Sequence, residues 1–176
     1  FEGGIAYWRP GGRVSFIHGS ILSAWAAFGW ERSWLGLPTS NETASTKGGV
    51  FQRFEHGVGY WSPATGAQFV GEPVLSAWGG YGYQTGSMGY PRSGGVAGID
   101  GSRHQIFEGG IAYWRPGGRV SFIHGSILSA WAASGWERSK VGLPTGRAVR
   151  QANGTMTQTF EKGSISVAPN GKVTIR

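Results

Sequence analysis

Cysteine is absent from this 176-residue chain, so disulfide bonds and cysteine-ligated metal sites are excluded. Long hydrophobic runs are also absent: the apolar stretches are short, as at Ile21–Trp25, and no segment is predicted to cross a membrane. The chain begins with Phe1 rather than Met and shows no signal-peptide pattern, so we expect a fragment or processed product of a longer protein. The lack of cysteine is compatible with a bacterial extracellular protein.

Glycine and aromatic residues are abundant instead. The chain has 33 Gly among 176 residues, well above the usual share of roughly 7%. It also has 9 Trp, 9 Phe and 6 Tyr, whereas disordered chains are poor in aromatic residues. This composition predicts a folded protein rich in turns and strands, and the length is sufficient for one domain with a sizeable core.

Positive charge predominates, with a net charge of +7, and it gathers near the C-terminus. Residues 140–176 hold six basic side chains and one acidic side chain, whereas residues 1–139 hold ten and eight. This end can contact an anionic polymer, a membrane surface or nucleic acid, or it can simply be a solvated tail. We do not expect nucleic-acid binding, because the aromatic residues follow a sequence repeat and not the basic tail.

The repeat is the dominant feature of the sequence. The text "FEGGIAYWRPGGRVSFIHGSILSAWAA" occurs at Phe1 and again at Phe107. A diverged copy begins at Phe54, and "FEKGSISVAPNGKVTIR" begins at Phe160, so the period is 53 residues. We therefore predict one repeat domain over 1–176, with units 1–53, 54–106 and 107–159 and a partial unit 160–176.

Turn signals divide each unit into short strands. "LGLP", "MGYP" and "VGLP" (residues 35–38, 88–91 and 141–144) place Gly two residues before Pro, which predicts a bend. Hairpin turns are expected at Lys47–Gly49, Asp100–Ser102 and Asn153–Thr155. Strands are predicted at 50–55, 5–8 and 13–17, with "RPGG" as the turn between the last two.

The periodicity then changes to that of a helix. Residues 19–29 place Ile21, Leu22, Trp25 and Ala26 on one face, with Ser20 as an N-cap and Gly29 as the stop. A helix this short must pack on the strands. We predict an α+β repeat protein of about three units, each a β-meander plus one helix, stacked in a propeller-like or ring-like array. Residues 160–176 would form a degenerate fourth hairpin that caps the stack or closes the ring.

These signatures resemble the LGFP repeat family. The Leu-Gly-x-Pro type bends recur three times at the 53-residue interval together with "SAW" and "FExG", over essentially the whole chain. The third letter of the name-giving motif differs, with Leu37, Tyr90 and Leu143 where Phe is expected. LGFP repeats are accessory modules of secreted actinobacterial proteins, often following an esterase, mycoloyltransferase or amidase domain. The resemblance implies a secreted protein located at the cell wall, with wall binding as its role and with any such catalytic domain outside this chain.

No catalytic constellation is recognised, so we expect a non-enzymatic protein without a cofactor. Four glutamates recur once per unit and are interpreted as structural anchors beside the glycine turns: Glu2, Glu55, Glu108 and Glu161. The four histidines show no metal-ligand spacing. The serines of "SAW" do not resemble a nucleophile elbow, and no phosphate-binding loop is present.

Aromatic residues are the candidate binding groups. The tryptophans of "SAW", Trp25, Trp78 and Trp131, are predicted core residues. Adjacent strand residues point to opposite faces, so each Tyr-Trp pair has one member that either stacks on a sugar or packs between units. Those pairs are Tyr7-Trp8, Tyr60-Trp61 and Tyr113-Trp114. Arg9 and Arg115 follow two of them and can donate hydrogen bonds to hydroxyl or anionic groups, whereas the middle unit has Ser62.

A second aromatic series follows the helix-ending glycine: Trp30, Tyr83 and Trp136. In "WER", a local ion pair between Glu31 and Arg32, or between Glu137 and Arg138, is expected. This loop either contributes to binding or covers the helix end.

Three functions remain open. The first is a non-catalytic module that binds cell-wall polysaccharide, such as arabinogalactan or a peptidoglycan-linked glycan, through pockets at equivalent positions in each unit. The second is a structural protein that self-associates head to tail, since residues 1–33 and 107–139 differ only at Phe28 and Ser134. The third, an enzyme, requires a non-repeating cluster of polar residues, which the sequence does not contain.

Overall fold

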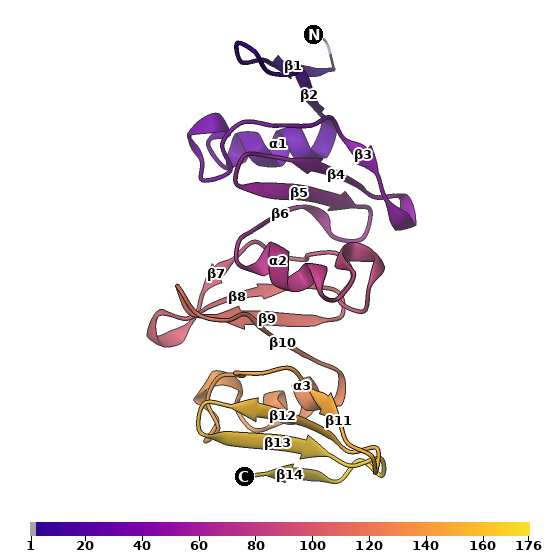
Figure 1. Ribbon diagram of the computed structural model, residues 1–176, viewed down its shortest axis with the longest axis vertical. Helices are drawn as coiled ribbons and strands as arrows, with labels where there is room; N and C mark the ends of the chain where they lie inside the picture. Colours follow the sequence, from indigo (N-terminus) through magenta and orange to yellow (C-terminus); the bar gives the residue numbers. More distant parts are fainter. Residues whose placement is uncertain (1–2) are drawn as a thin grey trace. The chain divides into compact units, whose positions relative to one another are not determined.

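The computed structural model describes residues 3–176 and divides the chain into two compact units (Figure 1). Unit 1 runs up to Gly95, and unit 2 is Val96–Arg176. Each unit contains short helices and a four-stranded antiparallel sheet, and each is described by itself below.

Unit 1 holds the first six strands and two α-helices. The strands are β1 Gly4–Tyr7, β2 Ser15–His18, β3 Thr43–Ala44, β4 Val50–Arg53, β5 Gly57–Ser62 and β6 Gly66–Gly71. The helices are α1 Gly19–Ala27 and α2 Val74–Gly79, with 3₁₀ turns η1 Trp30–Arg32, η2 Thr46–Gly48 and η3 Tyr83–Thr85. Strands β3 to β6 form one sheet in sequence order, and β1 and β2 form a separate two-stranded hairpin.

The limits and the buried face of helix α1 can be compared with their prediction. It starts at Gly19 after His18, which makes no side-chain capping bond, so the prediction of Ser20 as N-cap is wrong. It stops before Gly29, whose φ of 100° is the left-handed conformation that glycine adopts most easily. Ile21 and Trp25 are fully buried against β5 and β6, which confirms the predicted apolar face.

The core of unit 1 lies between α1, the hairpin β1–β2 and the following sheet. Its buried members are Ile17, Ile21, Trp25, Leu35, Phe54 and Phe69. We call a helix together with the four-stranded sheet that follows it in sequence a module. The first module begins with α1, because α1 packs on the strands that come after it. The boundary that the sequence predicts between the first two repeats, at residue 53, falls between β4 and β5, in the middle of one sheet.

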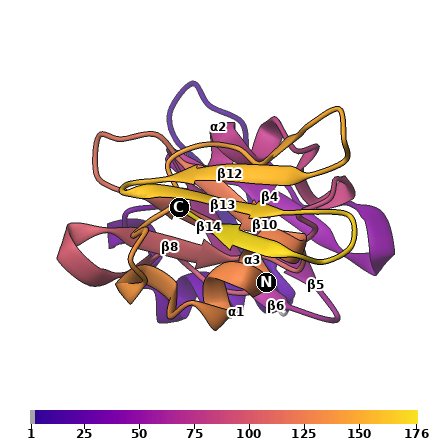
Figure 2. The same cartoon turned by 90° about the horizontal axis from the view of Figure 1, so that it is seen from below.

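Unit 2 also combines a helix with four-stranded antiparallel sheets. Its strands are β7 Val96–Ala97, β8 Arg103–Ile106, β9 Gly110–Trp114, β10 Ser121–His124, β11 Val149–Arg150, β12 Met156–Phe160, β13 Gly163–Val167 and β14 Val173–Ile175. Its helices are α3 Gly125–Ala133 and the 3₁₀ turns η4 Ile99–Gly101 and η5 Trp136–Arg138. Strands β7 to β10 form one sheet and β11 to β14 another, and α3 packs on β12 and β13 (Figure 2).

The C-terminal segment forms the predicted hairpin, as β13 and β14. Residues 160–176 supply β13 and β14, which with β11 and β12 complete the third four-stranded sheet. The core beneath this sheet includes Ile127, Trp131, Phe160 and Ile165. Within residues 3–176 no sheet closes into a barrel, and the predicted propeller-like or ring-like array is not shown.

Most predicted turns have the expected backbone. Gly36, Gly89 and Gly142 of the Leu-Gly-x-Pro bends have φ of 70°, 64° and 73°. Lys47-Gly48 and Asp100-Gly101 have positive φ at both residues, as a two-residue hairpin turn requires. The third turn departs from this pattern, since only Gly154 of Asn153-Gly154 has positive φ.

A buried glutamine at each 53-residue interval went unnoticed in the sequence. Gln52 donates from its side-chain amide to the carbonyls of Phe16 and Ser40, at 2.9 and 2.8 Å. Gln158 repeats this in unit 2, donating to Phe122 and Gly146 at 3.0 and 2.7 Å. Gln105 occupies the same position and is 1% exposed. These amides join the sheet of a module to the hairpin strand that precedes its helix.

Candidate functional site

Two equivalent pockets lie where the predicted Tyr-Trp-Arg segments meet the Leu-Gly-x-Pro bends. The pocket of unit 1 has a volume of about 230 Å³ and that of unit 2 about 190 Å³. Nine lining positions of unit 1 recur in unit 2 at an interval of 106 residues: Tyr7, Trp8, Arg9, Gly12, Arg13, Leu37, Pro38, Thr39 and Glu55 match Tyr113, Trp114, Arg115, Gly118, Arg119, Leu143, Pro144, Thr145 and Glu161.

An arginine–glutamate pair forms one wall of each pocket. In unit 1, Arg9 Nη1 lies 2.7 Å from Glu55 Oε1, while Glu55 Oε2 accepts the Leu37 backbone N–H at 2.9 Å. In unit 2, Arg115 Nη2 lies 2.9 Å from Glu161 Oε1, and Leu143 N–H donates to Glu161 Oε2 at 3.1 Å. Glu55 and Glu161 therefore anchor their bends, whereas Glu2 lies outside the described residues. The arginine predicted to face a ligand already has an internal partner.

Two features require glycine at this position of the bend: its φ is positive, and the glutamate carboxylate occupies the space that a side chain would need. A Cβ on Gly36 would lie 2.2 Å from Glu55 Oε2, and one on Gly142 would lie 2.6 Å from Glu161 Oε2. Partial burial of Glu161 would raise its pKa. Hydrogen bonds from Arg115 and the Leu143 N–H, together with nearby positive charge, nevertheless bring the pKa below the ordinary value.

The tyrosine of each Tyr-Trp pair is the inward-facing member. Tyr7, Tyr60 and Tyr113 each contact the buried helix tryptophan edge-on, at ring-centroid distances of 5.1, 4.9 and 5.2 Å. Burial raises the pKa of Tyr60 to about 12. Burial and a carboxylate partner raise the pKa of Tyr7 and of Tyr113. These rings are therefore mainly structural, with only Tyr7 and Tyr113 also lining a pocket.

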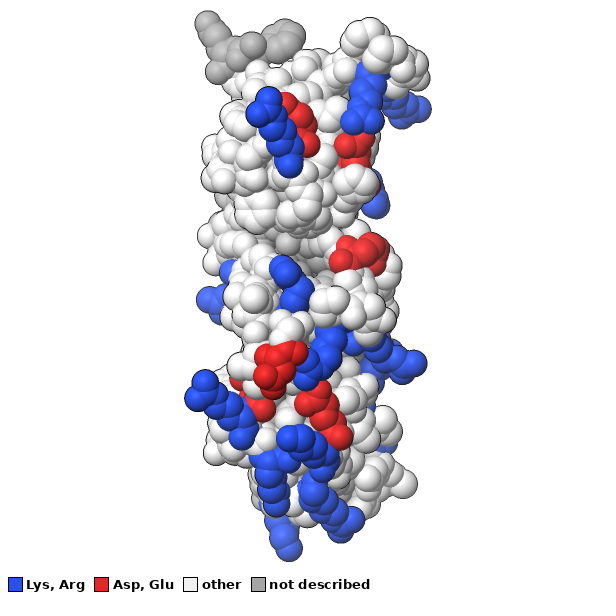
Figure 3. All heavy atoms as spheres, turned by 90° about the vertical axis from the view of Figure 1, so that its left-hand side faces the viewer, with Lys and Arg blue, Asp and Glu red and all other residues white. Residues whose placement is uncertain are grey.

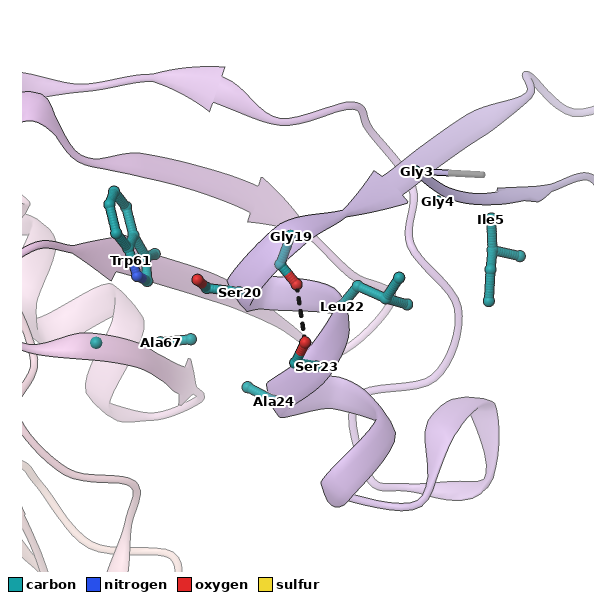
Figure 4. A pocket seen from close by; sticks show the side chains of 11 residues that line it. Gly3, Gly4, Ile5, Gly19, Ser20, Leu22, Ser23, Ala24, Trp61 and Ala67 are labelled. Carbon is teal, nitrogen blue, oxygen red and sulfur yellow. Dashed lines mark hydrogen bonds between the residues drawn. The ribbon is translucent and has the colours of Figure 1, made fainter. Parts of the chain in front are cut away.

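The tryptophans of the pairs have unequal environments. Trp8 is 63% exposed, whereas Trp114 is 9% exposed, with the guanidinium of Arg103 6.0 Å from its ring centroid. Trp61 is intermediate and lines a broad open groove of about 730 Å³ in unit 1 (Figure 4). In that view Trp61 and Ala67 project from the sheet beside Ser20 at the start of α1. The pairs are thus not three equivalent stacking platforms.

The second aromatic series is more uniform. Trp30, Tyr83 and Trp136 are 38%, 43% and 41% exposed. Each contacts the buried helix tryptophan of its repeat edge-on, at 5.5 or 5.6 Å between ring centroids. All three have left-handed backbones, with φ of 59°, 51° and 57°, which is uncommon for residues with bulky side chains. A strained backbone therefore holds a half-exposed ring at the same place in every repeat.

The glutamate that follows this ring bonds to the pocket tyrosine. Glu137 Oε1 accepts the Tyr113 hydroxyl at 2.6 Å, and the same contact joins Tyr7 to Glu31. The expected pair of Glu137 with Arg138 is replaced by this hydrogen bond. The structure thereby links the two aromatic series that the sequence predicted separately, because both rest on one buried tryptophan.

Several of the remaining polar side chains have partners inside the protein. Ser23 and Ser129 donate their hydroxyls to the helix carbonyls of Gly19 and Gly125. Ser76 donates to Glu72 at 2.7 Å. His18 lies 3.5 Å from Glu42. Over the described residues, no three His, Asp or Glu side chains are grouped as a metal site would require.

Charge differs between the units. The sequence up to Gly95 has six basic and five acidic residues, and Val96–Arg176 has ten and four. Figure 3 shows basic side chains gathered over the C-terminal part of the face in view, with carboxylates beside several of them.

Arg13, Arg119 and the Pro-Thr edge of the pockets were not predicted from the sequence, although they recur at an interval of 106 residues.

Comparison with known proteins gives one informative match. A family profile described as "LGFP repeat" matches residues 1–33, 35–86 and 88–139. No curated protein matches the chain. None of the helices within residues 3–176 is long and apolar enough to span a membrane.

Two solved structures resemble the chain weakly. A streptogramin B lyase has 12% identity and a TM-score of 0.21, and virginiamycin B lyase from Staphylococcus aureus has 9% and 0.22. The alignments cover 98% of this chain but 47% and 48% of those proteins, so the chain spans about half their length. Scores this low support no argument about fold or activity. The three profile matches cover most of the sequence, and the chain therefore belongs to the LGFP repeat family.

Proposed function

We propose that this chain is a non-catalytic module that binds a cell-wall polysaccharide and holds a secreted protein at the cell envelope. The observation that carries the proposal is the half-exposed ring of Trp30, Tyr83 and Trp136, presented on a left-handed backbone in all three repeats. Such a backbone costs about 1–3 kcal/mol at each site and persists where the surrounding structure enforces it. Its threefold recurrence indicates that ring placement matters.

These rings have the properties of a sugar-stacking platform. One face of a sugar ring presents C–H groups that pack on an aromatic face, and a rigid ring loses little entropy on binding. The buried tryptophan behind each ring fixes its orientation, at 5.5 or 5.6 Å. Three weak sites on one chain would bind a repeating polymer with useful avidity.

The test is retention on purified cell walls. The triple variant Trp30→Ala, Tyr83→Ala, Trp136→Ala should lose at least tenfold in apparent affinity, and each single variant only a few-fold, because avidity is shared among the sites. The matched control is Phe28→Ser. Phe28 is 47% exposed, and the equivalent position in the other copy already holds Ser134.

The control should bind like the wild type. A triple variant that remains folded by circular dichroism, yet is retained as well as wild type, would exclude these rings as the binding site. Failure of the wild-type chain to exceed a charge-matched control protein would exclude wall binding altogether. The absence of enzymatic activity belongs to the same proposal, and hydrolysis of wall esters or muropeptides by this chain would contradict it.

A second candidate function is assembly of copies into a filament or lattice. One observation favours it: residues 1–33 and 107–139 differ only at Phe28 and Ser134, so two nearly identical segments recur on one chain. Surfaces that recur in this way can support head-to-tail contacts between copies. Light scattering at high concentration distinguishes the candidates, because assembly predicts a mass that grows with concentration and wall binding predicts a monomer.

A further inference from the structure

We infer that the two equivalent pockets bind an anionic group of a saccharide, a carboxylate or a phosphate, through Arg13 and Arg119. This inference rests on the proposed function, since it names the ligand class for a polysaccharide-binding module. It concerns the pockets and not the exposed aromatic series. The two pockets share nine lining residues, so each conclusion drawn for one can be tested in the other.

The charges of each pocket do not cancel. Arg9 is neutralised by Glu55 at 2.7 Å, and Arg115 by Glu161 at 2.9 Å. Arg13 and Arg119 line the same pockets and are exposed. Over residues 3–176, neither of these two has a hydrogen-bond or ion-pair partner. Each pocket therefore carries one guanidinium whose donors are free for a ligand.

A tight turn connects the two arginines that line each pocket. The turn after Arg9 closes with the Gly12 N–H donating to the Arg9 carbonyl at 2.9 Å, and Gly11 has φ of 78°. The same bond spans Gly118 and Arg115 at 2.8 Å. The tight turn brings the two arginines of each pocket to one side. One is held by its glutamate, and the other is available.

The other walls suit a single sugar residue. Pro38 and Leu37 give an apolar surface, and Thr39 adds an exposed hydroxyl. The volumes of about 230 and 190 Å³ lie below the roughly 300–1,000 Å³ typical of pockets for drug-sized ligands. A guanidinium pairs well with a carboxylate or phosphate through two parallel N–H donors.

The middle repeat has a different charge arrangement. Ser62 and Gly66 replace both arginines there, and Arg92 occupies the position of Thr39. The first and third copies therefore carry both arginines, and the second copy carries neither.

The experiment measures binding of the whole chain to three oligosaccharides of equal length: oligogalacturonate, phosphorylated galactan and neutral galactan. We expect one or both anionic probes to bind at least tenfold more tightly than galactan. Arg13→Gln with Arg119→Gln should abolish that preference and leave galactan binding unchanged. The control, Lys140→Gln with Arg150→Gln, removes the same charge from exposed positions outside the pockets, and it should change affinity less than twofold.

The outcomes separate this inference from the proposed function. Equal affinity for anionic and neutral probes, or an equal loss in the control variant, would overturn the inference, while retention on walls would still support the proposed function. Loss of wall retention with intact anion preference would overturn only the proposed function. A single-stranded oligonucleotide of matched charge that binds as tightly as the acidic probes would overturn the saccharide assignment.

Discussion

Two hairpins with the same sequence have different surroundings in this protein. β1–β2 and β9–β10 both contain Ile-Ala-Tyr-Trp and Ser-Phe-Ile-His, yet Phe16 is 45% exposed and Phe122 is 1% exposed. Trp8 and Trp114 differ in the same direction, at 63% and 9%. Identical residues in corresponding hairpins can therefore be surface in one copy and core in the other.

The difference comes from a neighbouring strand. Within residues 3–176, β9 pairs with β8 as well as with β10, whereas β1 and β2 are paired with each other alone. Through this pairing Arg103 lies opposite Trp114, and His104 stacks on Tyr113 at 5.5 Å. The aromatic ring of Phe107, just after β8, contacts Phe122 at 5.6 Å. Burial of these residues is thus a property of the assembled sheet.

The largest expected effect comes from the same substitution in both hairpins. Phe122→Ala should destabilise the protein by about 3–5 kcal/mol, because it leaves a cavity in a packed region. Phe16→Ala should cost about 1 kcal/mol or less, since that ring is half in water already. Urea denaturation followed by tryptophan fluorescence measures both. Equal losses would show that the exposure of Phe16 does not describe the protein in solution.

The second effect tests the bend, which is alike in both copies. Gly36→Ala and Gly142→Ala should each cost about 2–3 kcal/mol, from left-handed strain and from displacement of the glutamate carboxylate. Gly11→Ala is the control, because Gly11 has a similar φ of 78° with no atom near its Cβ position. It should cost about 1 kcal/mol. A control as damaging as the others would remove the role assigned to the carboxylate.

A smaller effect is expected at the ion pair. Glu161→Gln should lower stability by about 1 kcal/mol near neutral pH, because it weakens a partly exposed pair and a backbone hydrogen bond. The folded pKa of Glu161 is depressed, so its contribution is present above the unfolded value of about 4.3 and is lost as pH falls through the folded pKa. Unfolding midpoints of wild type and variant should therefore converge in acid, and a constant gap would contradict this.

The smallest effect is spectroscopic. Burial and a carboxylate partner raise the folded pKa of Tyr113 and of Tyr7, and burial raises that of Tyr60 to about 12. The stability that follows from a raised pKa is present below the unfolded value of about 10 and is lost above it. Phenolate absorbance should show these tyrosines ionising late. Tyr113→Phe should remove a later step than Tyr7→Phe, because Tyr113 is the more deeply buried, and the reverse order would be inconsistent with the hairpin comparison.

Much of the fold was predictable because it depends on short-range chemistry. Glycine, proline and their spacing identified the Leu-Gly-x-Pro bends, and apolar periodicity identified the helix at 19–29, observed at Gly19–Ala27. The cap at Ser20 was wrong, because the helix begins one residue earlier at Gly19. The hairpin predicted in 160–176 is present as β13–β14, and its pairing with β12, the preceding strand, makes it part of a four-stranded sheet.

The candidate site was predictable only in part. The Tyr-Trp-Arg residues do line equivalent pockets, as their recurrence suggested. Their roles differ from expectation, since the tyrosines pack inward and Arg9 and Arg115 pair with glutamates. Those partners lie 46 residues away in sequence, and no local pattern reveals such a contact.

The sequence by itself determined the repeat, the bends and the position of each helix, because these follow from backbone preferences and from which residues avoid water. Tertiary structure alone decided which aromatic rings remain exposed and which arginine keeps free donors. Exposure and pairing depend on what an adjacent strand or bend brings into contact. Two copies of one sequence can therefore present different surfaces.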